Sequence, residues 1–133
     1  MFKRLFETKP FLVDAGLLLL RLFSLFLMYH GYDKAINFAE KASYWPDPFY
    51  IGGSASLSLT IFAELICPLF IVLGLFTRLA LLPAIVNMIF AILIGHVGQP
   101  FIEREHAFSF LIPFVVLFLT GPGKYSVDAL RKK

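Results

Sequence analysis

Long apolar runs separated by short polar stretches dominate the pattern of this chain. Four of these runs have the spacing of membrane-crossing helices, and they lie at about residues 11–32, 55–76, 79–97 and 102–120. About 20 residues of α-helix cross the ~30 Å hydrocarbon core of a bilayer. The fourth run has only about 15 strongly apolar positions, so we begin this span just after Pro100 and place the charged residues 103–105 among the lipid headgroups. The pattern predicts an all-α fold, an integral membrane four-helix bundle.

The composition supports the same class of protein. Hydrophobic residues make up 59% of the 133 positions, and the mean hydropathy is +0.79, which leaves too few polar side chains to coat a soluble domain of this size. We expect a single domain over residues 1–133, because four spans with short connections use almost the whole length. The first run is interpreted as a retained helix, since Arg21 interrupts the apolar core that a signal peptide needs.

The basic residues are distributed unevenly between the two ends of the predicted spans. Eight lie in the two tails and the second connection, and three lie in the first and third connections. The positive-inside rule therefore predicts that both the N and C termini are cytoplasmic and that residues 33–54 lie outside. This first connection contains Tyr44, Trp45, Phe49 and Tyr50 together with two prolines, so we expect a structured aromatic outer loop that roofs the bundle.

Two ionisable residues, Arg21 and Glu64, stand in the middle of the first two runs. A charge at the bilayer centre costs at least ~2.5 to 3.5 kcal/mol, so it usually faces the inside of a bundle and finds a partner. Because the two signs are opposite and the depths similar, we predict that these residues contact each other. Pro68 lies four residues beyond Glu64 and frees its carbonyl, which predicts a bend there. The pair either locks two helices together or forms part of a functional pocket, and the sequence leaves both readings open.

Three histidines, His30, His96 and His106, fall at the ends of spans that point outward in this topology. Imidazoles placed in this way can ligate a metal or haem, donate a hydrogen bond to a quinone carbonyl, or simply be wetted at the interface. The sequence has no His-x-x-x-His helix pair, so we predict no metal site and favour a quinone over haem. The single cysteine, Cys67, excludes an internal dithiol. The basic tails lack the interleaved aromatics of a nucleic-acid-binding face.

Four features, in order along the chain, resemble the DoxX family. They are the run RLFSLFLMYHGYDKA, the glutamate inside the second span, the turn GLFTRLA and the exit sequence GPGKYSVD. The resemblance extends from about Gly16 to Leu130, and the long aromatic outer loop departs from the family pattern. The residues that it singles out are Arg21, His30, Gly31, Lys34, Glu64, Gly74, Thr77, Arg78, Glu105, Gly121, Gly123, Ser126 and Asp128.

The resemblance implies a small membrane subunit of a redox assembly, which anchors a protein partner and presents a quinone or a thiol-type substrate. The candidate site is a polar pocket formed by Arg21, His30, Glu64, His96, Glu105 and His106. The alternatives are a non-catalytic scaffold or assembly chaperone, and a small-solute or proton pathway in which Glu64 titrates. We expect no catalysis by the chain alone, contact with membrane lipid and a protein partner, and a location in a bacterial inner membrane. Homo-oligomer formation stays open.

Overall fold

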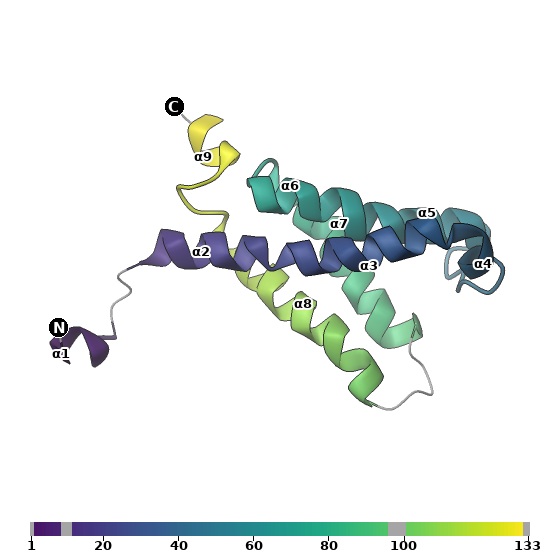
Figure 1. Ribbon diagram of the computed structural model, residues 1–133, viewed down its shortest axis with the longest axis horizontal. Helices are drawn as coiled ribbons and strands as arrows, with labels where there is room; N and C mark the ends of the chain where they lie inside the picture. Colours follow the sequence, from purple (N-terminus) through teal and green to yellow (C-terminus); the bar gives the residue numbers. More distant parts are fainter. Residues whose placement is uncertain (1, 9–11, 96–100, 132–133) are drawn as a thin grey trace.

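The computed structural model describes residues 2–8, 12–95 and 101–131, and within these ranges every regular element is helical. The all-α prediction is therefore confirmed for this part of the chain. Figure 1 shows α2 and α3 following one another along the molecule, with α8 oblique to them. The α-helices are α1 (Phe2–Leu5), α2 (Val13–Leu22), α3 (Ser24–Ile36), α4 (Phe38–Ala42), α5 (Gly53–Ile61), α6 (Cys67–Leu73), α7 (Thr77–Phe90), α8 (Phe101–Thr120) and α9 (Val127–Arg131), and the π-helical turns are η1 (Phe62–Ile66) and η2 (Ala91–Gly95).

Three helical segments are long and apolar enough to cross a membrane, namely Val13–Ile36, Gly53–Leu73 and Thr77–Ile94. Helix α8 has 20 residues, but its apolar stretch is the shorter segment Glu105–Thr120. Membrane helices are thus confirmed, by length and composition, for the first three predicted spans. The fourth span and the cytoplasmic location of the termini stay predictions.

The first segment continues beyond its predicted end at residue 32, because α3 ends only at Ile36. Lys34 therefore lies in the last turn of a helix and not in the outer loop. A one-residue break at Phe23 separates α2 from α3. Next to the break, the Ser24 hydroxyl donates a hydrogen bond to the Arg21 carbonyl at 2.6 Å, a back-bonding geometry that tends to bend helices.

The second segment is distorted where its proline predicts a bend. Pro68 has no N–H with which to bond the Glu64 carbonyl, so the regular α-helical ladder is interrupted four residues earlier. The backbone N–H of Cys67 instead donates to the Phe62 carbonyl, which closes the π turn η1. Glu64 lies in the middle of this turn and is 5% exposed. π turns inside α-helices occur frequently at functional sites.

Small residues bring the helices close together. A methyl group added to Gly31 of α3 would lie 2.8 Å from the backbone carbonyl carbon of Glu64, so the two main chains are in direct contact. Helix α7 presents Ala80 and Ala84 to the interior, and α8 presents Ala107. Close packing through small residues is the usual way in which membrane helices associate. The buried apolar core consists of Leu17, Leu27, Cys67, Ile71, Ala80, Leu81, Ala84, Met88, Ala107, Phe110, Phe114 and Leu117.

Residues 37–52 connect α3 to α5, and we call this connection the cap. Its geometry is fixed by Asp47, whose carboxylate accepts hydrogen bonds from the Ile51 N–H at 3.0 Å, the Gly52 N–H at 2.7 Å and the Ser56 hydroxyl at 2.8 Å. Burial alone would raise the pKa of Asp47, but these hydrogen bonds hold it below its ordinary value. The end of the bundle next to the cap is the cap end, and the end that carries residues 121–131 is the tail end.

Candidate functional site

A cavity of about 680 Å³, the cap cavity, lies at the cap end of the bundle. This volume is within the range of small-molecule sites, which are concave, mostly apolar and furnished with a few polar groups. Side chains from α3, the cap, α5, η1, α7, η2 and α8 line it. Its polar lining residues are His30, Lys34, Ser56, Thr60, Glu64, Asn87 and His106, and its aromatic ones are Tyr44, Trp45, Phe49, Phe62 and Phe90.

A three-residue cluster forms the most polar part of the cap cavity. The Lys34 ammonium lies 2.6 Å from Oε2 of Glu64, and the side-chain amide of Asn87 donates to Oε1 at 3.1 Å. Both side chains of the ion pair are shielded, since the lysine side chain is 18% exposed and the glutamate side chain 7%. Buried charges are tolerated in proteins when they are paired and hydrogen-bonded in this way. The cluster as a whole carries no net charge.

Two α-helices and one π turn bring this cluster together. Lys34 projects from the last turn of α3, Glu64 from η1 and Asn87 from α7. The direct contact between Gly31 and the Glu64 backbone places η1 one turn from Lys34, because residues three apart on a helix are neighbours. The Asn87 amide completes the arrangement by occupying the second carboxylate oxygen. Each partner thus comes from a different segment of the sequence.

The cap covers the cavity with aromatic side chains. The Lys34 ammonium lies 5.9 Å from the centre of the Trp45 ring, within the range of a cation–π contact. The ring of Phe49 meets that of Phe90 edge to face at 5.3 Å, which ties the cap to the end of α7. The loop therefore has the roofing position that its aromatic content indicates.

Two of the three histidines meet beside the cavity. The rings of His30 and His106 stack with centroids 5.7 Å apart and an interplanar angle of 20°, and both line the cap cavity. Glu105, which precedes His106, is exposed and is not among the cavity-lining residues. His96 lies outside the residues that the structure describes. Of the six predicted site residues, the structure thus brings His30, Glu64 and His106 together.

Arg21 does not belong to this site, and the predicted Arg21–Glu64 contact is wrong. Its Nη2 donates to the Tyr125 carbonyl at 2.6 Å, at the tail end, while Glu64 is paired with Lys34 at the cap end. Gly31, which touches the Glu64 backbone, is ten residues from Arg21 along one segment, or ~15 Å at 1.5 Å per residue. Arg21 and Glu64 each lie in the middle of an apolar run of the sequence. They lie at different depths in the bundle, because the two helical segments are shifted along their axes.

Arg21 instead helps to hold the tail against the bundle. Its side chain is fully buried, and a methyl group added to Gly74 would overlap both its guanidinium and the side chain of Ser126. Among the described residues, none accepts a hydrogen bond from its Nε or Nη1. Gly74 has φ of +71°, a conformation that favours glycine, so the turn after α6 suits this residue sterically and conformationally.

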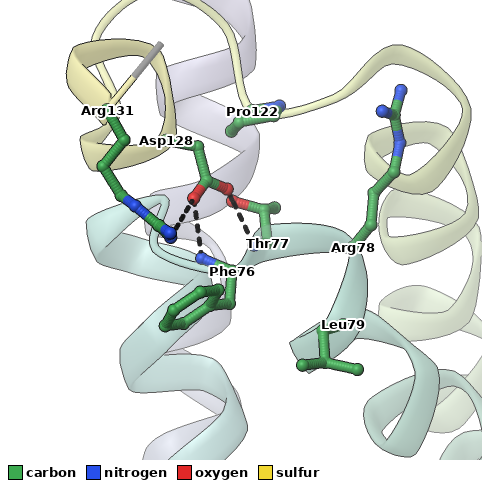
Figure 2. Close-up of a pocket in the computed structure, with 7 residues that line it drawn as sticks. All are labelled: Phe76, Thr77, Arg78, Leu79, Pro122, Asp128 and Arg131. Carbon is green, nitrogen blue, oxygen red and sulfur yellow. Dashed lines mark hydrogen bonds and ion pairs between the residues drawn. The ribbon is translucent and has the colours of Figure 1, made fainter.

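Asp128 joins the tail to the start of α7, as Figure 2 shows. Its carboxylate accepts hydrogen bonds from the Phe76 N–H at 2.8 Å and from the Thr77 N–H and hydroxyl at 2.9 and 2.8 Å, and Arg131 lies 3.9 Å away. These contacts satisfy backbone donors at the amino-terminal end of the helix. Burial alone would raise the pKa of Asp128, but the hydrogen bonds from Thr77 and Phe76, assisted by Arg131, hold it below its ordinary value.

A second cavity, of about 420 Å³, lies beside this contact at the tail end. Its polar side chains are already engaged in joining elements of the fold. Asp128 bonds to the start of α7, and Nε of Arg78 donates to the Phe118 carbonyl near the end of α8 at 2.9 Å. Figure 2 shows Arg78 directed away from the carboxylate. The cap cavity is therefore the better candidate for a functional site.

The family-model comparison matches residues 16–97 to DoxX. The chain belongs to the DoxX family. The matched range contains nearly all of the first three segments of the DoxX protein and most of the cap cavity, whereas α8 and the sequence GPGKYSVD lie beyond it. No curated protein and no solved structure compared with the chain gives a match.

Two residues of the cavity cluster were not identified as site residues from the sequence. Lys34 was placed in the loop, although its spacing of four from His30 puts both on one face of an extended helix. Asn87 is not among the residues singled out from the sequence, although it is the only amide in its apolar run. A polar residue within a membrane span is in itself a signal of function, and that signal could have singled out Asn87.

Proposed function

We propose that this DoxX protein is a small membrane subunit of a redox assembly and that it holds a quinone-type ligand in the cap cavity. The observation that carries the proposal is the Lys34–Glu64–Asn87 cluster in a largely apolar cavity. Such a cavity suits an amphipathic molecule whose apolar body lies against the walls and whose polar head meets the cluster.

The charge balance of the cluster favours an uncharged head group. Lys34 and Glu64 neutralise each other at 2.6 Å, so an additional ionic group would enter a poorly solvated site with no countercharge. The cluster is rich in donors, because an ammonium has three N–H groups and a side-chain amide has two. A quinone ring fits these conditions, since it is neutral and flat and carries two carbonyl acceptors. The aromatic rings of the cap supply apolar faces of matching shape.

The redox role is assigned to an assembly and not to this chain alone. The sequence has one cysteine, Cys67, which is buried in the core and cannot form an internal dithiol. Electrons that reduce a quinone in the cap cavity must therefore be delivered by a partner protein. The family resemblance supports the same division of labour, in which the membrane subunit anchors the partner and positions the ligand.

Trp45 makes the proposal directly testable, because it is the single tryptophan of the chain and lines the cap cavity. The purified protein in detergent is titrated with ubiquinone-1 while the tryptophan fluorescence is followed. We expect saturable quenching. Lys34→Met should weaken binding roughly tenfold or more, since a hydrogen bond to a charged group contributes about 1.5 to 3 kcal/mol. Asn87→Leu should weaken it roughly fivefold, since a hydrogen bond between neutral groups contributes about 1 kcal/mol.

Matched variants outside the cavity provide the controls. Lys41→Met and Asn37→Leu change the same residue types at positions that do not line the cap cavity, and they should leave the affinity within twofold. Equal affinity in the wild type and both cavity variants would refute the assignment of the cluster. Loss of partner co-purification in those variants, without any saturable quinone binding by the wild type, would favour the scaffold function instead.

A further inference from the structure

The second segment presents an apolar stripe to its surroundings. Leu59, Phe62, Ile66, Leu69 and Leu73 recur at intervals of three or four residues and are all exposed. The opposite face of the same segment carries buried residues, including Glu64 and Cys67. In a membrane segment, such an exposed apolar stripe is the side that meets hydrocarbon chains.

The third segment has a corresponding stripe. Leu79, Leu82, Val86, Ile89 and Leu93 are exposed and follow the same spacing, while Ala80, Ala84 and Met88 face the core. Both segments therefore have a well-defined outward side along most of their length.

These two stripes meet the cap cavity at its side. Leu59, Phe62 and Val86 belong to the outward stripes and also line the cavity. Helix α7 packs chiefly on α8, α6 and η1, whereas α5 packs on α3, α4 and η1. On the cap side of η1, α5 and α7 thus pack against different neighbouring helices. We call the line between α5 and α7 the seam, and along it the cavity-lining residues are also exposed on the outward surface.

From this continuity we infer that the cap cavity opens sideways, between α5 and α7, and that its ligand carries a long isoprenoid chain which leaves through this opening. The inference rests on the proposed function for the identity of the head group. A cavity of about 680 Å³ accommodates a ring and the first part of a chain, so the rest of a long chain must lie outside. Along the seam, the rest of the isoprenoid chain would contact the apolar stripes and enter the bilayer, where it meets hydrocarbon chains as apolar as itself.

The test maps both ends of the ligand by photolabelling. Two ubiquinone analogues, one with a diazirine on the ring substituent and one with a diazirine at the end of a ten-carbon chain, are incorporated into phosphatidylcholine vesicles that contain the protein. Labelled positions are then identified by mass spectrometry of peptides. We expect the ring probe to label the cavity near Thr60 and Asn87, and the chain probe to label the outward stripes at residues that do not line the cavity, such as Ile66 and Ile89.

The outcomes separate the inference from the proposed function. Ring labelling in the cavity together with chain labelling of residues 43–52 would mean that the chain leaves through the cap, and it would overturn only the inference. Absence of competable ring labelling in the cavity would overturn the proposed function.

A matched pair of variants tests the opening itself. Val86→Trp places a bulky ring between α5 and α7 and should reduce labelling by the chain probe at least fivefold. A ring probe with a chain of only one isoprene unit should still label the cavity in this variant, which would show that the cavity is folded. Leu82→Trp lies one turn away on the same stripe and does not line the cavity, so it should leave labelling by both probes unchanged. Equal chain labelling in Val86→Trp and Leu82→Trp would contradict the lateral opening.

Discussion

The Lys34–Glu64 pair should be coupled energetically, and a double-mutant cycle measures this coupling. Lys34→Met keeps the length of the side chain but removes its charge. Glu64 would then be left 5% exposed, with the neutral Asn87 amide as the hydrogen-bond donor to its carboxylate. Breaking a buried ion pair by removing one partner costs about 3 to 5 kcal/mol, because the other charge stays buried without compensation.

The reverse change should cost less. Glu64→Gln leaves the Lys34 ammonium, which is 18% exposed at its side chain and lies near the Trp45 ring, so a loss of roughly 1 to 3 kcal/mol is expected. The double variant contains no buried charge at this position and can keep an amide contact with Asn87. Its loss should therefore fall short of the sum of the single losses by about 1.5 to 3 kcal/mol.

Thermal unfolding in one detergent at pH 7 provides the assay. At roughly 3 to 5 °C per kcal/mol for a chain of this size, Lys34→Met should lower the Tm by about 10 to 20 °C. The exposed pair Lys41–Asp33, separated by 3.7 Å, is the control and should show a coupling below about 1 kcal/mol. Losses for Lys34 and Glu64 that add to within about 0.5 kcal/mol would refute the pairing.

Three further predictions concern packing, acid sensitivity and orientation. Gly31→Ala should cost about 1 to 3 kcal/mol in thermal unfolding through its main-chain contact, whereas Gly16→Ala, with nothing within 4 Å, should not. Asp128, whose pKa is lowered by folding, stabilises the protein fully above about pH 4 and progressively less as the pH falls further, so Asp128→Asn should flatten that part of a pH–stability curve. In a cysteine-free background, an impermeant maleimide on intact cells should label Ser43→Cys but not Lys124→Cys; the reverse would overturn the topology.

The helices and their polar residues were largely predictable from the sequence, because hydrophobic runs report burial in a membrane directly. The first three spans appear within a few residues of their predicted ranges. The position of the aromatic cap agrees with its composition, since aromatic side chains gather at the ends of membrane helices, and Trp45 and Phe49 line the cap cavity. His30 and His106 were expected at one depth, and their rings meet there.

The pairing of charges could not be predicted in the same way. Whether two residues on neighbouring helices lie at the same depth depends on how far the helices are shifted along their axes. This shift depends on local packing, such as the contact of Gly31 with the Glu64 backbone. Arg21 is therefore opposite Gly74 and the tail, not opposite Glu64. The tail contacts of Asp128 span about fifty residues of sequence, and no local pattern reports an interaction of that range.

The π turn at Phe62–Ile66 changes how the second segment should be numbered against a helical wheel. A π turn accommodates one residue more than an α-helical turn over the same rise, so the wheel loses phase at this position. The outward residues nevertheless keep intervals of three or four through the turn, from Leu59 before it to Leu69 and Leu73 after it, so one apolar stripe runs past the distortion. The turn thus leaves the outward side of the segment unchanged and alters its interior side, where it holds Glu64 between Lys34 and Asn87.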